Sequence, residues 1–126
     1  RDCIAVRGNN VIIDHCSASW GVDENVQVYG PYSDVTIQWC ITSEALCDSI
    51  HPKGPHGMGM ILGCAGMSKV SVHHCLFAHN QGRNPLIAAR SKGAPIYDVR
   101  NNVAYARFQP LVQIVCVRSS ISLTVI

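Results

Sequence analysis

The stretch Val11-Ile-Ile-Asp-His-Cys16 is the first of four related hexapeptides in this chain. The other three are Val35-Thr-Ile-Gln-Trp-Cys40, Val70-Ser-Val-His-His-Cys75 and Tyr97-Asp-Val-Arg-Asn-Asn102. Each has apolar residues at its first and third positions and Cys or Asn at its sixth. The sixth positions lie 24, 35 and 27 residues apart, with clusters of Gly, Pro, Asn and Ser between them. This period of two predicts short strands and gives no support to helices.

Strands that return in a similar register after variable insertions are typical of a solenoid. The chain is therefore predicted to be all-β, a right-handed parallel β-helix of about four coils. Successive coils stack about 4.8 Å apart, so equivalent positions form ladders through the interior. The predicted ladder consists of Cys16, Cys40, Cys75 and Asn102. A β-sandwich stays open as the alternative fold, because alternating residues and regular turns suit it as well.

The two ends of the chain carry no visible cap for the terminal coils, which a solenoid needs to cover its unpaired edges. We therefore expect a piece of a longer chain, truncated at both ends. Residues 1–107 are assigned to the β-helix core. Residues 108–126 are apolar and β-branched and form a strand-like tail without further assignment.

Composition narrows the classes of function. The chain has 126 residues, of which 48% are hydrophobic and only 14% charged, and its net charge is +2. This hydrophobicity excludes a disordered chain, and the balanced charge gives no support to nucleic-acid binding. No run of 18 apolar residues occurs, which argues against a membrane span. We expect a monomer with neither a nucleic-acid nor a membrane partner.

The seven cysteines and six histidines do not follow the spacing of a structural zinc site, and no Cys-x-x-Cys occurs. Cysteines in equivalent ladder positions point in parallel, so we interpret them as small core residues and not as disulfides. His73 and His74 are adjacent on a predicted strand and are expected on opposite faces. His15, His73 and His74 are therefore interpreted as stacked or surface imidazoles.

A series of segments between residues 2 and 107 then resembles, in order, the pectate lyases of polysaccharide lyase family 1. Val11–Trp20 is similar to the family pattern W-I-D-H-C-S-x-S-W. The resemblance continues through Asp23–Val26, Val35–Trp39, His56–Gly63, Val72–Asn80, Gly82–Pro85 and Val99–Tyr105. It implies a secreted, calcium-binding parallel β-helix. The implied activity is cleavage of polygalacturonate by β-elimination, which gives 4,5-unsaturated oligogalacturonates.

The resemblance also implies a metal site and a catalytic residue. Asp14 falls on the family's calcium-binding aspartate and Asp23 on the first acid of the following pair. The second acid of that pair is replaced by Gln27, and Glu24 compensates only if its loop turns it inward. Arg83 falls on the arginine assigned as the base that removes a proton. Since a guanidinium keeps its proton in nearly all proteins, Arg83 is a candidate for base or for electrostatic stabiliser.

Substrate-binding positions match the family less well. The family's lysine aligns with Met58, and Lys53 on the preceding Pro- and Gly-rich loop is the candidate stand-in. The basic positions after the Arg-x-Pro element are occupied by Leu86 and Ala88, which makes Arg90 the nearest substitute. His56, in a Gly-rich loop, is the histidine retained as a substrate contact.

Non-catalytic roles for these residues, and other functions for the chain, also fit the sequence. Asp23 and Glu24 suit a solvated loop, and Arg83 suits an exposed one. Trp20 and Trp39 are candidate sugar platforms, although Trp39, inside a predicted strand, is expected in the core. A glycoside hydrolase would need two carboxylates across the scissile bond. A non-catalytic carbohydrate-binding β-helix would explain the departures from the family pattern.

Overall fold

The computed structural model describes residues 1–89, 95–105, 113–116 and 120–125. Its strands form three faces. The first face consists of β1 (Ile4–Val6), β4 (Glu24–Gly30), β7 (Met58–Cys64), β10 (Leu86–Ala89) and β12 (Gln113–Cys116). The second consists of β2 (Val11–Asp14), β5 (Val35–Gln38), β8 (Lys69–His73), the first half of β11 (Ile96–Tyr105) and β13 (Ser120–Val125). The third consists of β3 (Ser17–Ser19), β6 (Ile41–Ser43), β9 (Leu76–Ala78) and the second half of β11.

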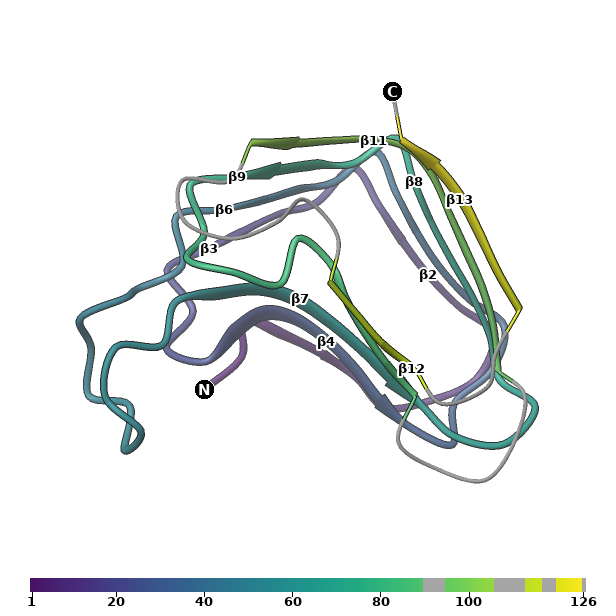
Figure 1. Cartoon of the computed structure of the whole chain (residues 1–126), viewed down its shortest axis with the longest axis horizontal. Coiled ribbons are helices and arrows are strands. Elements are labelled where there is room, and N and C mark those ends of the chain that lie inside the picture. Colours follow the sequence, from purple (N-terminus) through teal and green to yellow (C-terminus); the bar gives the residue numbers. More distant parts are fainter. Residues whose placement is uncertain (90–94, 106–112, 117–119, 126) are drawn as a thin grey trace.

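The chain visits these three faces in the same order in each coil (Figure 1). Strands β1 to β3 form the first coil, β4 to β6 the second, β7 to β9 the third, and β10 with β11 the fourth. The tail that the sequence left without assignment contributes β12 and β13, which pair with β10 and β11 as the next coil begins. Among the described residues there is no helix, and so none that could cross a membrane.

The register of the strands reproduces the sequence repeat. Val11 pairs with Val35, Val35 with Val70, and Val70 with Tyr97, so the first residues of the four hexapeptides form one row. Every strand pair in the described part of the chain is parallel. A β-sandwich is built from antiparallel sheets. The predicted parallel β-helix is therefore confirmed.

Inward-facing apolar side chains from all three faces fill the centre of the coil. Ile37 and Val72 of the second face, Leu62 of the first and Phe77 of the third are completely buried. Tyr97 is equally buried, and its hydroxyl oxygen accepts a hydrogen bond of 2.9 Å from the Cys64 amide. Since buried apolar area is the main source of stability, this continuous core fixes the three faces around it.

The tight corner, where the second face turns into the third, is the same in each coil. Its first residue has a left-handed backbone, with φ between 52° and 55°; these residues are His15, Trp39, His74 and Asn101. The next residue points inward and joins the coils. The Cys75 thiol donates to the Ile37 carbonyl of the preceding coil at 3.7 Å, and the Asn102 amide donates to Val72 at 2.9 Å.

The cysteine ladder forms as predicted. The cysteines with free thiols are Cys3, Cys16, Cys40, Cys47, Cys64 and Cys75. Cys40 and Cys75 are buried, whereas Cys16 is exposed on the first coil. Burial raises the pKa of the Cys75 and Cys64 thiols to about 11. These thiols behave as small core residues.

Two expectations about the corner are wrong. Trp39 does not lie in the core, because its left-handed backbone turns the ring outward, where it is 52% exposed. The ring stacks between His15 and His74, at centroid distances of 6.2 and 4.3 Å. His73 and His74 do not point to opposite faces either. The chain bends between them, and their Nδ1 atoms lie 2.9 Å apart.

Candidate active site

The loop corner, where the third face returns to the first, differs from coil to coil. We define it as residues 20–23, 44–57 and 79–85, the connections that lead into β4, β7 and β10. The longest of them projects to the left in Figure 1. Because these connections share neither length nor sequence, each brings a different set of side chains to the start of the first face.

Gly59 on β7 allows the third loop to pack against the first face. The Gly59 amide donates to Gly82 at 2.9 Å, and the Met60 amide donates to Arg83 at 2.7 Å. A Cβ at position 59 would lie 2.7 Å from the Arg83 carbonyl oxygen, closer than real Cβ contacts allow. Only glycine therefore fits where the Arg83 backbone passes over β7.

Arg83 is held at this corner by its backbone and by its charge. Its φ of 59° lies in the left-handed region, which costs a non-glycine residue about 1–2 kcal/mol. Its Nη1 contacts the Glu24 carboxylate directly and lies 4.0 Å from Asp23 Oδ1. Glu24 is only 3% exposed. A carboxylate is retained at that depth because a guanidinium partners it.

Asp23 lies at the centre of the site. Its Oδ1 is 2.9 Å from His56 Nε2, and its Oδ2 is 3.3 Å from His51 Nε2. The two imidazoles come from the same loop and stack at a centroid distance of 4.2 Å, with 12° between their planes. Both histidine side chains are about nine-tenths buried, with 8% exposed for His51 and 10% for His56.

A third acid, Asp2, completes a cluster of carboxylates. Oxygens of Asp2, Asp23 and Glu24 lie within 4.8 Å of one another. The Asp2 carboxylate accepts a hydrogen bond of 3.2 Å from the Glu24 amide. Burial, and then the charge of Asp23, raise the pKa of Asp2 above its usual value. Three hard oxygen donors this close together suit a divalent cation.

Buried asparagines support the loop corner from inside. The Asn80 amide donates to Thr42 O and to Asn84 Oδ1, at 2.9 Å each. Asn80 Oδ1 accepts hydrogen bonds of 3.2 Å from the Ala45 amide and from the Asn25 side chain. Asn80 thus links the second and third loops, and Asn25 links them to β4. This network holds in place the backbone of the segments that carry the charged residues.

The structure brings together four of the residues singled out from the sequence: Arg83, Asp23, Glu24 and His56. Glu24 does turn inward. Asp14 is instead exposed at the end of β2, near the tight corner, where its carboxylate lies 2.6 Å from His15 Nδ1. In the described part of the chain Asp14 joins neither group of potential metal ligands.

Other predicted positions lie at the edge of the site or outside it. Lys53 is exposed on the loop between His51 and His56. Met58 is the register partner of Glu24 and bridges to Gly82. Gln27 lies further along β4, opposite Ile61. Arg90 falls outside the described residues.

Sequence reasoning missed His51 and Asp2. His51 had a usable signal, because it shares a Pro- and Gly-rich loop with His56 and the two imidazoles bracket the tip of that loop. Asp2 had none, since it precedes the first strand and its proximity to Asp23 depends on how β1 pairs with β4.

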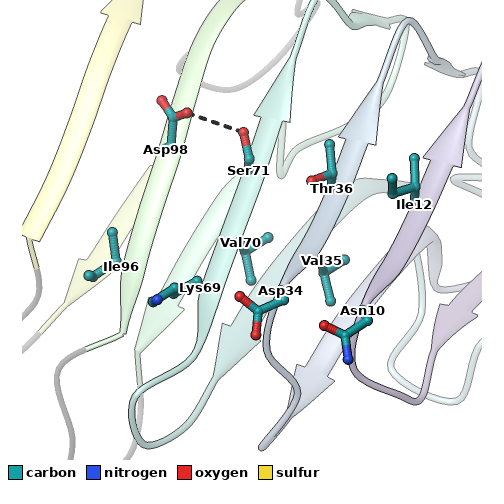
Figure 2. A pocket seen from close by; sticks show the side chains of 10 residues that line it. All are labelled: Asn10, Ile12, Asp34, Val35, Thr36, Lys69, Val70, Ser71, Ile96 and Asp98. Atoms are coloured by element: carbon teal, nitrogen blue, oxygen red, sulfur yellow. Dashed lines mark hydrogen bonds between the residues drawn. The ribbon is translucent and has the colours of Figure 1, made fainter.

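A separate hollow of about 430 Å³ lies on the second face (Figure 2). In it, Ser71 donates a hydrogen bond of 3.2 Å to Asp98. Its lining residues include none of those predicted for the site, and two of them, Ile12 and Ile96, are exposed apolar side chains. The charged cluster of the loop corner is therefore the candidate active site.

The chain is similar to several curated proteins that share one name. The chain is 34% identical to the probable pectate lyase C of Aspergillus terreus over 106 residues, which is 83% of this chain and 22% of the relative. It is 36% identical to that of Aspergillus flavus over 98 residues, 78% of this chain and 20% of the relative. The probable pectate lyase C of Aspergillus fumigatus is 32% identical over 106 residues.

No protein-family model matches the chain. The chain spans about a fifth of the length of the curated relatives that it matches. These matches confirm the resemblance that the sequence motifs predicted: the chain is a relative of the pectate lyases, corresponding to about a fifth of their length.

Proposed function

We propose that this chain carries the catalytic part of a calcium-dependent lyase that cleaves polygalacturonate by β-elimination and gives 4,5-unsaturated oligogalacturonates. The observation that carries the proposal is the placement of Arg83 against Asp23 and Glu24, which belong to a different coil. The names of the relatives support the substrate class. Action outside the cell, which rests on the resemblance alone, and a monomeric state are also part of the proposal.

The reaction requires three events at one uronate residue. A base removes the proton at C5, the electron pair forms the C4–C5 double bond, and the C4–O4 bond breaks. The leaving O4 then takes up a proton, so the reaction needs neither an oxidant nor a reductant. An acidic sugar also places a carboxylate beside C5, and its charge must be balanced before C5 can lose a proton.

Asp2, Asp23 and Glu24 fit the calcium ion that the family resemblance implies, because they offer carboxylate oxygens within 4.8 Å of one another. Bound Ca²⁺ would balance the uronate carboxylate and stabilise the charge that develops on it during proton removal. Asp23 and Glu24 were predicted as ligands, and we propose Asp2 as the third ligand in place of Asp14, which lies outside this cluster.

Arg83 is a cation in the arrangement described, because the Glu24 carboxylate that touches it stabilises the charged form. In this form it neutralises the substrate carboxylate and the charge that grows at C5. A role as the base requires that it leave Glu24 and lose its proton. Metal binding by Glu24 would remove this carboxylate from Arg83, which connects the two roles.

Incubation of the purified chain with polygalacturonate, followed by ultraviolet absorbance, tests the proposal. The conjugated 4,5-unsaturated product should accumulate in Ca²⁺ and cease to form in excess chelator. Circular dichroism before and after chelation is the control for folding. A folded chain that binds polygalacturonate without forming this product would contradict the proposal and favour the non-catalytic carbohydrate-binding alternative. A product without a double bond would favour the hydrolase.

A further inference from the structure

The loop corner contains a second group of potential metal ligands, and its donors differ from those of the carboxylate cluster. We propose that Asp23, His51 and His56 bind a divalent first-row transition-metal ion, for which Zn²⁺ is the probe. This site uses Asp23 in common with the carboxylate cluster and involves no cysteine. The proposal does not depend on the lyase activity.

The spacing of the donor atoms fits a common ion. One carboxylate oxygen and one ring nitrogen from each histidine lie within 4.8 Å of one another. The contacts of Asp23 with the two Nε2 atoms are 2.9 and 3.3 Å. Ligands about 2.0–2.2 Å from a tetrahedral zinc ion are roughly 3.3 Å apart. Only a small outward movement of His56 would therefore admit the ion.

Two of the donor atoms lack a hydrogen-bond partner. Asp23 Oδ1 and His56 Nε2 are both buried and lie 2.9 Å apart, an ion-pair distance if His56 is protonated, yet neither atom makes a hydrogen bond within the described residues. A buried polar atom that makes no hydrogen bond destabilises the folded state. A cation between the two atoms would satisfy both, and this observation points to a ligand at the site.

The donor set selects the kind of ion. Imidazole nitrogen suits Zn²⁺ and its first-row neighbours, whereas Mg²⁺ and Ca²⁺ prefer oxygen. Two histidines and one carboxylate leave coordination positions open for water or a substrate oxygen. Since one Asp23 carboxylate serves both groups of ligands, the transition metal and Ca²⁺ should compete for it.

Two neighbours oppose binding and must adjust. The Lys53 amide donates to His51 Nδ1 at 3.2 Å, and a metal on Nε2 requires the proton to be on Nδ1. This hydrogen bond is exposed, so water can take the place of His51 as the acceptor for the Lys53 amide. Arg83 lies 4.0 Å from Asp23 and repels a cation, although its direct contact is with Glu24. Both effects lower the affinity without removing a ligand.

Titration calorimetry with Zn²⁺ on the substrate-free chain, with Mg²⁺ as the comparison ion, tests the assignment. We expect one saturable Zn²⁺ site per chain whose affinity depends on His51, whereas Mg²⁺ binding at the carboxylate cluster should not depend on this residue. His51→Gln should weaken the Zn²⁺ affinity at least about tenfold and leave Ca²⁺ binding unchanged. His79→Asn removes an exposed histidine outside the cluster and should change neither affinity.

Several results would overturn the assignment. These are the absence of saturable Zn²⁺ binding, an equal effect of His51→Gln and His79→Asn, or Zn²⁺ binding that persists unchanged in His51→Gln. The last would assign the ion to the exposed thiols of Cys3 or Cys16. Asp23→Asn supplies a second variant, whose folding is checked by circular dichroism, and should weaken Zn²⁺ and Ca²⁺ binding together. The lyase assay is separate, so its failure leaves this test intact.

Discussion

The tight corner and the loop corner belong to the same coils, but the first repeats from coil to coil and the second does not. At the tight corner each coil repeats one left-handed residue followed by one inward-facing residue, and neighbouring coils satisfy each other's polar groups. At the loop corner no two connections share a length, and the side chains from different coils meet as ion pairs.

The difference shows how a repetitive fold acquires a site. Repetition stacks equivalent residues of successive coils on one another. This arrangement suits apolar residues of a core, but it would place identical charges beside each other. Asp23 and Arg83 come together because their loops do not repeat. Changes at the tight corner should therefore affect stability alone, whereas changes in the charged cluster of the loop corner, or in the asparagines that support it, should also affect chemistry.

The largest effect is expected in the shared core. Ile37→Ala removes a completely buried side chain from β5 and should lower the free energy of unfolding by about 2–5 kcal/mol. Ile12→Ala, on the adjacent strand, alters a side chain that is 69% exposed. It should change the free energy of unfolding by less than about 0.5 kcal/mol. Urea unfolding followed by circular dichroism measures both. Equal losses would contradict the assignment of inward and outward positions.

A pair of asparagine variants separates the two corners. Asn80→Ala removes the link between two loops, and Asn102→Ala removes the bonds to Cys75 and Val72 at the tight corner. Each should cost about 1–3 kcal/mol of unfolding free energy, since backbone groups lose their partners.

Only Asn80→Ala should also reduce the turnover of polygalacturonate, because only Asn80 supports the loops that carry Arg83. Unfolding curves and product absorbance on the same preparations distinguish the effects. A comparable loss of turnover in Asn102→Ala, measured where both variants are folded, would show that the corners are not independent.

Glu24→Gln should reduce turnover by about tenfold to a hundredfold, since Arg83 loses its charge partner and the carboxylate cluster loses an acid. Glu44→Gln is the matched control, because Glu44 is exposed and accepts a bond from Trp20 outside the cluster. Initial rates at saturating Ca²⁺ provide the comparison. Similar rates for Glu24→Gln and the wild type would remove Glu24 from the site.

Thiol labelling gives the smallest and cleanest contrast within the cysteines. The pKa values of Cys64 and Cys75 are raised to about 11, so only about a thousandth of each is thiolate at a pH near 8. Iodoacetamide should therefore modify exposed Cys16 in the folded chain and reach Cys64 and Cys75 only after unfolding. Mass spectrometry of digests identifies the modified sites. Rapid labelling of Cys75 in the folded chain would contradict its place in the ladder.

The sequence could predict what repeats. The hexapeptides fixed the strands and register of the second face, because apolar alternation and ladder positions are local properties. The outward position of Trp39 escaped prediction, since a bulky residue with positive φ is rare and a strand pattern hides it. The geometry of the tight corner is defined by backbone angles, which the strand pattern of the sequence does not reveal.

The candidate site could be predicted in part, through motifs and not through geometry. Asp23, Glu24, His56 and Arg83 carried a recognisable pattern, while the contact between Asp23 and His51 depends on the conformation of a long loop. Asp14 shows the opposite case, in which a residue with the right motif lies at the other corner. Sequence distance gives no measure of how loops without a repeat will meet.

Replacement of Arg83 by lysine tests the central claim most directly, since lysine keeps the positive charge and loses the planar guanidinium. Arg100→Lys is the matched control, because Arg100 is exposed and pairs with Asp98 outside the loop corner. The rate at which the absorbance of the unsaturated product increases should be at least about a hundredfold lower for Arg83→Lys. For Arg100→Lys it should equal the wild-type rate. Wild-type turnover by folded Arg83→Lys would contradict the account.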